Sequence, residues 1–374
     1  MIYKQYILGD IATFKYGSMP KKNLISESGY PIYTGYKHVG FYPTYNIEKE
    51  SVIVVARGVG GTGDVKICPA KTHLTNLSIA LDINESILDK KYFYYKYSLS
   101  NLRYLDSGSA QSQITINDLK RIKLELPDIK EQKAIANILS SLDDKIELNN
   151  KINKNLEELA QTLYKQWFVD FEFPNENGNP YKSSGGKMIE SELGLIPEGW
   201  EVKEQGEYFP IITGKKNANY STDDGEFNFF TCSQQIFKAP GYSFEGSAIL
   251  VAGNGDFNVK YYKGKFEAYQ RTYVLIPHNE KLSGLLYFLI KENLSEITSG
   301  HRGSVIKFIT KGDLEKYKII MPKDIQLLEQ MSRQFQNIVN KIQHNNEENT
   351  KLAEMRDLLL PKLMSGEIRL PIEE

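Results

Sequence analysis

The chain is poor in cysteine: its 374 residues include only Cys68 and Cys232. Two cysteines cannot build a disulfide framework, and neither stands in a CxxC pair or near a histidine cluster with the spacing of a zinc site. We expect two buried free thiols and no metal site. No apolar run approaches the ~20 residues that cross a bilayer, and residues 1–10 lack the apolar core of a signal peptide. These shortages predict a cytoplasmic protein that does not contact a membrane.

Catalytic motifs are also scarce. The glycine-rich segment 58–63 lacks the Gly-Lys-Ser/Thr ending of a phosphate-binding loop, so we interpret it as a turn after a strand. Residues 127–131 resemble a nuclease motif only superficially and stand where a helix cap is expected. Asn179-Pro180-Tyr181 resembles part of an adenine-methyltransferase motif, but it occurs in a linker rich in Gly, Ser and Asn. We therefore assign no catalytic residue and no cofactor to the chain.

Net charge is nearly absent, at −1. A free-standing nucleic-acid-binding protein usually has a basic excess, so the total argues against such a partner. The balance varies along the chain, however. Residues 1–127 hold 16 basic against 11 acidic residues, 128–194 hold 8 against 12, 195–322 hold 15 of each, and 323–374 hold 7 against 9. The basic charge therefore lies in the first globular segment, and the helical segments described below are acidic.

What the chain does contain is an internal repeat with a period near 196 residues, the size of a whole domain. The run Ser51–Ala56 matches Ser247–Ala252, and glycines follow both. Further matches keep the same order and nearly the same offset: Asp118-Leu119 with Asp313-Leu314, Pro127 with Pro322, Glu131-Gln132 with Glu329-Gln330, and Lys145-Ile146 with Lys341-Ile342. We interpret the chain as two copies of one unit.

Each copy begins with about 125 residues rich in Tyr, Phe, Val, Ile and Gly, which is typical of short strands with a few helices. A long helix follows. The first is expected from Glu131 to Trp167, 37 residues or roughly 55 Å at ~1.5 Å per residue. With Ile135 at heptad position a and Ile138 at d, seven of its ten a and d positions are apolar, enough for a coiled-coil seam. The second, after Pro322, has an apolar face made of Met331, Phe335, Ile338, Ile342, Leu352, Met355 and Leu359.

Helices this long must bury their apolar stripes, so we predict that the two pair antiparallel. The expected fold is of the α+β class, with two similar mixed α/β domains separated by two long helices packed as an antiparallel coiled coil. The expected boundaries are 1–127 for the first globular domain, 128–170 for the first helix, 171–194 for an extended linker, 195–322 for the second domain, and 323–374 for the second helix and tail.

Asn149 lies at the middle of the first helix, and Asn345 is its repeat equivalent. The midpoints of two antiparallel helices meet, and a polar residue in a seam fixes register at a cost in stability. We therefore predict that Asn149 and Asn345 hydrogen-bond across the pair. The alternative is that both face solvent.

Two similar domains on a rigid spacer suit a ligand with two similar features at a fixed distance, and duplex DNA is such a ligand. Half-sites one helical turn apart, about 34–36 Å, present the same groove to both domains. Base edges are read by Arg, Lys, Asn and Gln on loops of a rigid scaffold. The first domain offers Lys15, Lys21, Lys22, Lys37, His38, Arg57, Gln111 and Gln113. The second offers Lys215, Lys216, Asn217, Gln234, Gln235, Asn254, Arg271, His301 and Arg302. For each residue taken singly, a solvated surface position is the alternative.

The sequence also resembles a known family. Trp167–Pro174, Tyr181–Gly186 and Ser191–Trp200 closely resemble the central region of the specificity subunits of type I restriction-modification enzymes, and the Leu8-Gly9-Asp10 start is similar too. The resemblance implies two target recognition domains, each reading half of a bipartite DNA target, with the helices as a ruler between them. It implies a non-catalytic subunit that docks two methyltransferase (M) subunits carrying S-adenosylmethionine, and restriction (R) subunits that use ATP and Mg. Glu348 and Lys362 stand at seam-equivalent positions and depart from perfect twofold symmetry.

Two other functions stay open at this point. A coiled-coil scaffold with two protein- or carbohydrate-binding domains would use tyrosine-rich loops equally well. The recognition half of a fused restriction-methyltransferase is the second possibility. Neither the target sequence nor the spacer length follows from the sequence.

Overall fold

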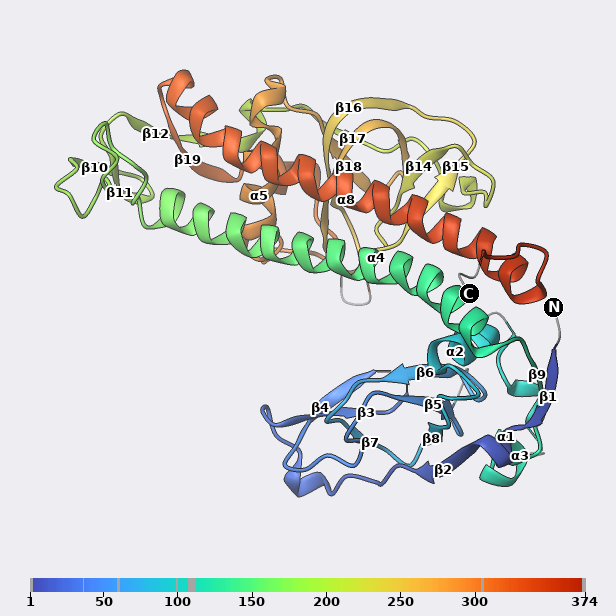
Figure 1. The fold of residues 1–374 in the computed structure, drawn as a ribbon. Coiled ribbons are helices and arrows are strands. Elements are labelled where there is room, and N and C mark those ends of the chain that lie inside the picture. Colours follow the sequence, from blue (N-terminus) through green and yellow to red (C-terminus); the bar gives the residue numbers. More distant parts are fainter. Residues whose placement is uncertain are drawn as a thin grey trace. The chain divides into compact units, whose positions relative to one another are not determined.

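A computed structural model describes residues 3–35, 37–58, 61–98, 100–106, 112–303 and 306–371. The chain divides into two compact units: Met1–Glu147 with Asn349–Glu374, and Leu148–Glu348. The long helices α4 (Ile129–Tyr164) and α8 (Ile325–Ser365) each contribute one half to each unit (Figure 1). The mixed fold class with two long helices is therefore confirmed.

The first unit is built around an antiparallel four-stranded sheet in the order β2-β8-β5-β6. Its strands are β2 (Ala12–Tyr16), β8 (Ser78–Ile83), β5 (Ser51–Val55) and β6 (Val65–Cys68). A three-stranded sheet β4-β3-β7 consists of β3 (Tyr30–Tyr33), β4 (His38–Tyr42) and β7 (His73–Leu74), and β1 (Lys4–Ile7) pairs with β9 (Lys123–Leu126). The short helices are α1 (Leu8–Ile11), η1 (Lys22–Leu24), α2 (Lys90–Ser98), η2 (Arg103–Leu105) and α3 (Ile116–Lys120). β5 is buried along Val52–Val55, as expected for a central strand.

The second unit is built around a six-stranded sheet in the order β13-β18-β16-β17-β14-β15. Its strands are β13 (Ile211–Thr213), β14 (Phe227–Phe230), β15 (Ile236–Ala239), β16 (Phe244–Ala252), β17 (Val259–Ala268) and β18 (Thr272–Leu275). The hairpin β10 (Met188–Ser191) with β11 (Gly194–Pro197) precedes β12 (Trp200–Glu204), which pairs with β19 (Lys318–Pro322). The shorter helices are η3 (Lys165–Val169, a π-helix), η4 (Gln205–Glu207), η5 (Ala218–Tyr220), η6 (Glu280–Leu282), α5 (Ser283–Glu292), α6 (Leu294–Ile297) and α7 (Lys311–Glu315).

Helices α4 and α8 run antiparallel within each unit. In the first unit, Arg356 donates a hydrogen bond to Asp143 at 2.7 Å. In the second, Asn149 donates to Glu348 at 2.8 Å and Asn345 donates to Asn153 at 2.7 Å. Residue numbers rise along α4 as they fall along α8, so the predicted direction of pairing is confirmed. The predicted bond between Asn149 and Asn345 is wrong, because Asn149 donates to Glu348 and Asn345 donates to Asn153. The alternative that both face solvent is wrong too, since both side chains are buried.

The heptad assignment on α4 was wrong at three of its ten positions. The expected a positions are buried or half-buried, but among the expected d positions Lys145, Leu159 and Gln166 are exposed. The stripe instead passes through Leu139, Ile146, Asn153, Ala160 and Trp167, one residue further on at each turn. The assignment followed the larger apolar side chains and therefore placed Leu159 in the seam. Leu159 is half-exposed, whereas the smaller Ala160 is completely buried. On α8, Met355 is likewise exposed, although Met331 and Phe335 are buried as expected.

Two smaller expectations also need correction. Cys68 is buried, and burial raises the pKa of its thiol to about 11, but Cys232 is only half-buried. The segment expected as an extended linker packs tightly: Phe173 stacks on Trp200 with ring centroids 4.9 Å apart, and Tyr181 stacks on Phe173 at 4.7 Å. The linker's aromatic residues therefore belong to the core of the second unit.

Replacing Phe335 by Ala should destabilise the second unit. Its ring is fully buried and contacts Trp167, Phe168 and Phe288 edge-on or tilted. Loss of a buried Phe costs about 3–5 kcal/mol because a cavity remains. Urea denaturation of the purified chain measures this loss. The neighbouring exposed Gln334→Ala serves as control and should change stability by less than about 0.5 kcal/mol. Equal effects of the two substitutions would contradict the packing described.

Candidate nucleic-acid interface

The same backbone arrangement occurs at one end of the central sheet in both units. The amide of Gly17 donates to the Ser78 carbonyl at 3.1 Å, and the amide of Gly214 donates to the Thr272 carbonyl at 2.9 Å. A Cβ on Gly17 would overlap the Thr75 carbonyl oxygen, and one on Gly214 would overlap that of Tyr269. Close backbone approach explains the glycine in each copy.

The loop before α3 in the first unit, and the loop before α7 in the second, return to this point. The amide of Ile114 donates to the Ala56 carbonyl at 3.0 Å, and the amide of Ile309 donates to the Gly253 carbonyl at 3.0 Å. Just beyond each bond a capped helix begins: Asp118 with Thr115 forms one capping box, and Asp313 with Thr310 forms the other. The repeat therefore extends to individual hydrogen bonds, and it brings several distant loops together twice.

In the second unit these loops surround a hollow of about 540 Å³. Residues that line it include Asn254, Tyr269, Gln270, Arg271, Tyr273 and Phe308. Lys216 joins this cluster, because its carbonyl accepts a hydrogen bond from the Gln270 amide at 2.9 Å. The structure thus brings the sequence-predicted Lys216, Asn254 and Arg271 to one place.

Two arginines of this cluster differ in their surroundings. Arg302 Nη1 contacts Asp313 Oδ2 at 2.7 Å. Burial opposes ionisation of Asp313, but hydrogen bonds from Arg302 and Thr310 outweigh it and hold the pKa of this carboxyl below its usual value. Arg271 is exposed, and no ion pair joins it to a carboxylate in the part of the chain that the structure describes. Its guanidinium is therefore available to a ligand.

The remaining predicted residues of the second unit lie around these loops. Lys215 is adjacent, with its ammonium 5.3 Å from the centre of the Phe244 ring. Gln234 and Gln235 are exposed in the β14–β15 turn, where Cys232 donates to the Arg271 carbonyl at 3.3 Å. Asn217 is exposed before η5, and the His301 ring lies 6.2 Å from that of Phe257.

In the first unit the corresponding cluster contains Lys37, Arg57 and Gln113. Arg57 and Gln113 form an isolated β-bridge. The turn before Lys37 reaches the same place, because Ser78 donates its hydroxyl hydrogen to the Thr34 carbonyl at 3.3 Å. Gln111 lies outside the described residues.

Other predicted residues of the first unit occupy a different part of it. Lys15 is exposed on β2, two residues before Gly17. Lys21 and Lys22 lie at η1, where the Lys21 amide contacts the Tyr42 hydroxyl at 3.4 Å. His38 stands on β4 with its ring 4.7 Å from that of Phe41. The Lys21 contact with Tyr42 ties η1 to β4, the strand that also carries His38.

Sequence reasoning missed several residues of the two clusters. Tyr269 and Gln270 stand between the end of β17 and Thr272, and Asn76 occupies the matching turn of the first unit. Lys260 on β17 is hydrogen-bonded to Asn258, and burial lowers the pKa of its ammonium. A polar residue directly after a strand was the available signal, but the sequence alone did not show which strands end at this edge.

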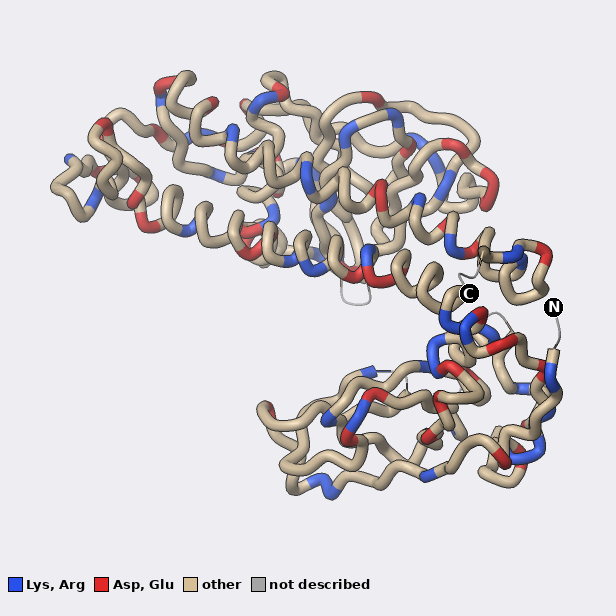
Figure 2. Tube along the Cα trace, in the orientation of Figure 1, with Lys and Arg blue, Asp and Glu red and all other residues tan. Residues whose placement is uncertain are grey.

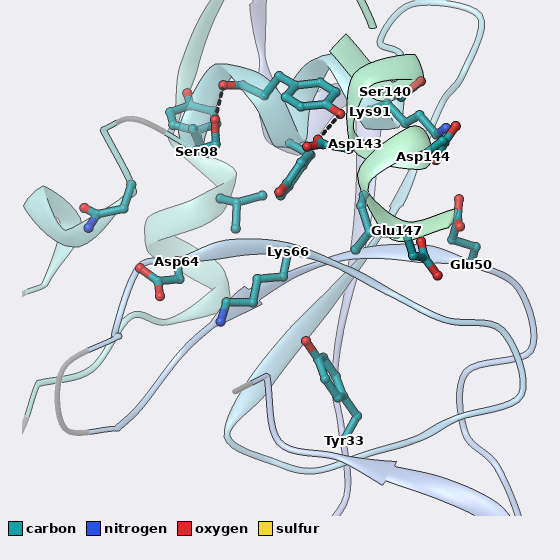
Figure 3. Close-up of a pocket in the computed structure, with 16 residues that line it drawn as sticks. Tyr33, Glu50, Asp64, Lys66, Lys91, Ser98, Ser140, Asp143, Asp144 and Glu147 are labelled. Carbon is teal, nitrogen blue, oxygen red and sulfur yellow. Dashed lines mark hydrogen bonds between the residues drawn. The ribbon is translucent and has the colours of Figure 1, made fainter. Parts of the chain in front are cut away.

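A second hollow, of about 620 Å³, lies in the first unit between β6, α2 and α4 (Figure 3). Tyr95 donates to Asp143 there at 2.6 Å, and Asp64, Asp144, Glu147 and Glu50 also line it. Five carboxylates against Lys66 and Lys91 make this surface acidic, so it does not suit phosphate. Figure 2 shows acidic and basic residues interspersed along α4, which does not form a continuous basic stripe.

Among the helices of the described ranges, none combines the length and the apolar composition of a membrane span. Within those ranges, no group of three or more His, Cys, Asp or Glu residues could hold a metal ion.

Comparison with known families bears on these paired clusters. The sequence model of the family described as the type I restriction modification DNA specificity domain matches residues 3–158 and matches again at 197–354. The two matches cover most of the chain, and each contains one loop cluster. The chain belongs to this family. The predicted membership of the type I specificity subunits is therefore confirmed.

Individual members of the type I specificity family are similar over long stretches. The EcoDI specificity subunit of Escherichia coli is 37% identical over 177 residues, which cover 47% of this chain and 35% of that protein. The MjaIX specificity subunit of Methanocaldococcus jannaschii is 27% identical over 311 residues, covering 75% of this chain and 69% of that protein. The chain thus spans about a third of the E. coli protein's length in that match and about two thirds of the second relative.

A solved type I specificity structure shares the fold. The S subunit of the type I restriction-modification system of M. genitalium superposes with a TM-score of 0.70, covering 97% of this chain and 96% of that one. Sequence identity is 20%, so the agreement concerns the fold alone.

Replacing Gly214 by Ala should disturb the loop cluster of the second unit. The new Cβ would overlap two backbone carbonyl oxygens, which cannot move as a flexible side chain can. We expect a loss of about 1–3 kcal/mol in the free energy of unfolding, measured with urea. Gly300→Ala is the matched control, because no atom lies within 4 Å of the added Cβ. Equal losses at both positions would show that close approach does not explain Gly214.

Proposed function

We propose that this chain is the DNA-reading subunit of a type I restriction-modification complex. Each recognition domain reads one half of a bipartite duplex target through the loops gathered at one end of its sheet. The observation that carries the proposal is the duplicated cluster: the same strand ends and the same backbone hydrogen bonds occur twice, with basic and amide side chains on the loops. Methylation and cleavage belong to partner subunits, and this chain supplies recognition.

The chemistry of the two clusters supports DNA over other ligands. Exposed Lys215 in the second domain and Lys37 and Arg57 in the first can neutralise phosphates without defining a sequence. Amide side chains such as Gln113 and Gln270 can form paired hydrogen bonds with base edges. A carbohydrate- or protein-binding scaffold would not require basic side chains at the same edge of both domains.

The outer faces of the long helices suit partner subunits. Leu148 and Leu159 of α4 are each about half exposed at 51% and 50%, and they are eleven residues apart, which places them on one face. Leu358 of α8 is 62% exposed. Apolar residues in such positions are typical of protein interfaces. We infer that methyltransferase subunits dock on these faces.

Asn149 and Asn345 fit a role in setting helix register. Both are almost completely buried, at 1% and 0% exposure, and each donates to the opposite helix. Buried amides must keep their hydrogen bonds, and a shift of either helix along the other would break them. We propose that these bonds fix the register of the two helices. The register in turn sets the spacing of the half-sites.

The proposed function predicts a gapped methylation motif. Cells that carry this chain with its methyltransferase subunit should methylate a two-part sequence, read by single-molecule sequencing of their DNA. Gln113→Ala should relax base preference in one half and leave the other unchanged, since each domain reads separately. A continuous motif, or changes in both halves from this single substitution, would refute the proposal that each domain reads one half of the target. Indifference of the assembled complex to DNA would favour the scaffold.

Leu159→Glu should weaken capture of the methyltransferase subunit. A charge on an exposed apolar face opposes desolvation in an interface while leaving the core intact. Co-purification of the two subunits at equal expression measures capture, and the melting temperature of the chain should stay unchanged. Gln161→Glu adds the same charge on the opposite face of α4 and is the control. Full capture by the Leu159 variant would place the docking surface elsewhere.

A further inference from the structure

One turn in each domain can be aligned residue by residue from its hydrogen bonds. The first connects β7 to β8 through Thr75–Leu77, and the second connects β17 to β18 through Tyr269–Arg271. Each turn closes in the same way: the Ser78 amide donates to the Thr75 carbonyl at 3.3 Å, and the Thr272 amide donates to the Tyr269 carbonyl at 2.7 Å.

A second pair of bonds fixes the middle of the alignment. The Ala56 amide donates to the Leu77 carbonyl at 2.8 Å, and the Gly253 amide donates to the Arg271 carbonyl at 2.9 Å. Together the bonds match Thr75 with Tyr269, Asn76 with Gln270, and Leu77 with Arg271. An amide residue therefore stands at the middle position of both turns. The third position is Leu77 in the first turn and Arg271 in the second.

The side chain of Arg271 is suitably placed to meet a ligand. It is exposed beside the hollow that Asn254, Tyr269 and Phe308 also line, next to the exposed Gln270. A guanidinium that reads guanine must offer two N–H donors to O6 and N7 at once, so it must not be occupied by a carboxylate. Arg271 meets this condition within the described ranges. Arg302, at the same edge, does not, because Asp313 accepts its Nη1 hydrogen at 2.7 Å.

The pairing of Arg302 has a structural consequence. Asp313 also accepts hydrogen bonds from the Thr310 amide at 2.7 Å and from the Thr310 hydroxyl at 2.8 Å. Arg302 therefore ties its loop to the cap of α7, and Arg302 and Phe308 form a β-bridge within the same loop. These contacts hold Phe308 at the rim of the hollow.

We propose that Arg271 reads a guanine in the half-site of the second domain, and that Arg302 is a positioning residue that holds the adjacent loop. Leu77 gives the first domain only an apolar contact at the corresponding position, so that half-site has no guanine recognised from this turn. The two domains thereby read their half-sites with different side chains on turns of the same backbone conformation. This inference rests on the proposed function.

The test uses the chain assembled with its methyltransferase subunit. After the motif has been mapped, Arg271→Ala should make one guanine of the second domain's half-site degenerate. A bidentate contact discriminates by about 1–3 kcal/mol, so preference for that base should fall roughly 5- to 150-fold. Arg302→Ala should weaken binding to all sequences alike and leave the motif unchanged. Arg333→Ala, an exposed arginine of α8, should change neither.

A modified base separates recognition from folding. A duplex with 7-deazaguanine at the affected position lacks the N7 acceptor. It should bind the wild-type complex more weakly than the natural duplex, whereas the Arg271→Ala complex should bind both duplexes equally. Equal sensitivity of both complexes to 7-deazaguanine would overturn the assignment, as would loss of base preference in the Arg302 variant. If the wild-type complex shows no gapped motif, the proposed function itself fails; if the motif is gapped but Arg271→Ala leaves it intact, only this inference fails.

Discussion

The structure depends on burial of the apolar stripes of two very long helices. A 36-residue helix with one apolar face is not stable alone in water, so its stripe must be covered along its whole length. Each half of α4 meets half of α8 and a domain core. Ile135 and Leu139 share a core with Leu360 and Leu363 in the first unit, and Trp167 packs on Phe335 in the second. The core of each unit and the helix halves packed on it are consequently stabilised by the same contacts.

Polar groups interrupt this seam near the middle of each helix. Asn149, Asn153 and Asn345 donate or accept hydrogen bonds across the pair, in place of apolar packing. Asn149 donates to Glu348, and its repeat equivalent Asn345 donates to Asn153, so amides of both helices bond across the seam. Stability is lower than an all-apolar seam would give, but alternative registers lose these bonds.

The two units illustrate how a duplicated scaffold can carry different side chains on equivalent loops. Backbone hydrogen bonds around Gly17 and Gly214 are the same, and so are the capping boxes that follow. These bonds depend on main-chain atoms and small residues, so they survive changes elsewhere. Side chains on the loops, such as Leu77 and Arg271, are free to differ because they contribute little to either core. The fold and the chemical groups that the loops expose are thus determined by different atoms of the same turns.

The sequence by itself determined the duplication, the two long helices and their direction of pairing, because these follow from an ordered set of matches and from an apolar periodicity sustained over many turns. It also identified Lys216, Asn254 and Arg271 as candidates, since each is a basic or amide residue near a strand end. Only the tertiary structure decided the true seam, in which Ala160 is buried and Leu159 exposed, and which loops meet. It alone paired Arg302 with Asp313 and aligned Leu77 with Arg271. The physical reason is that these features depend on atoms distant in the chain, whose approach is set by sheet order and helix packing, and no local pattern of residues encodes that approach.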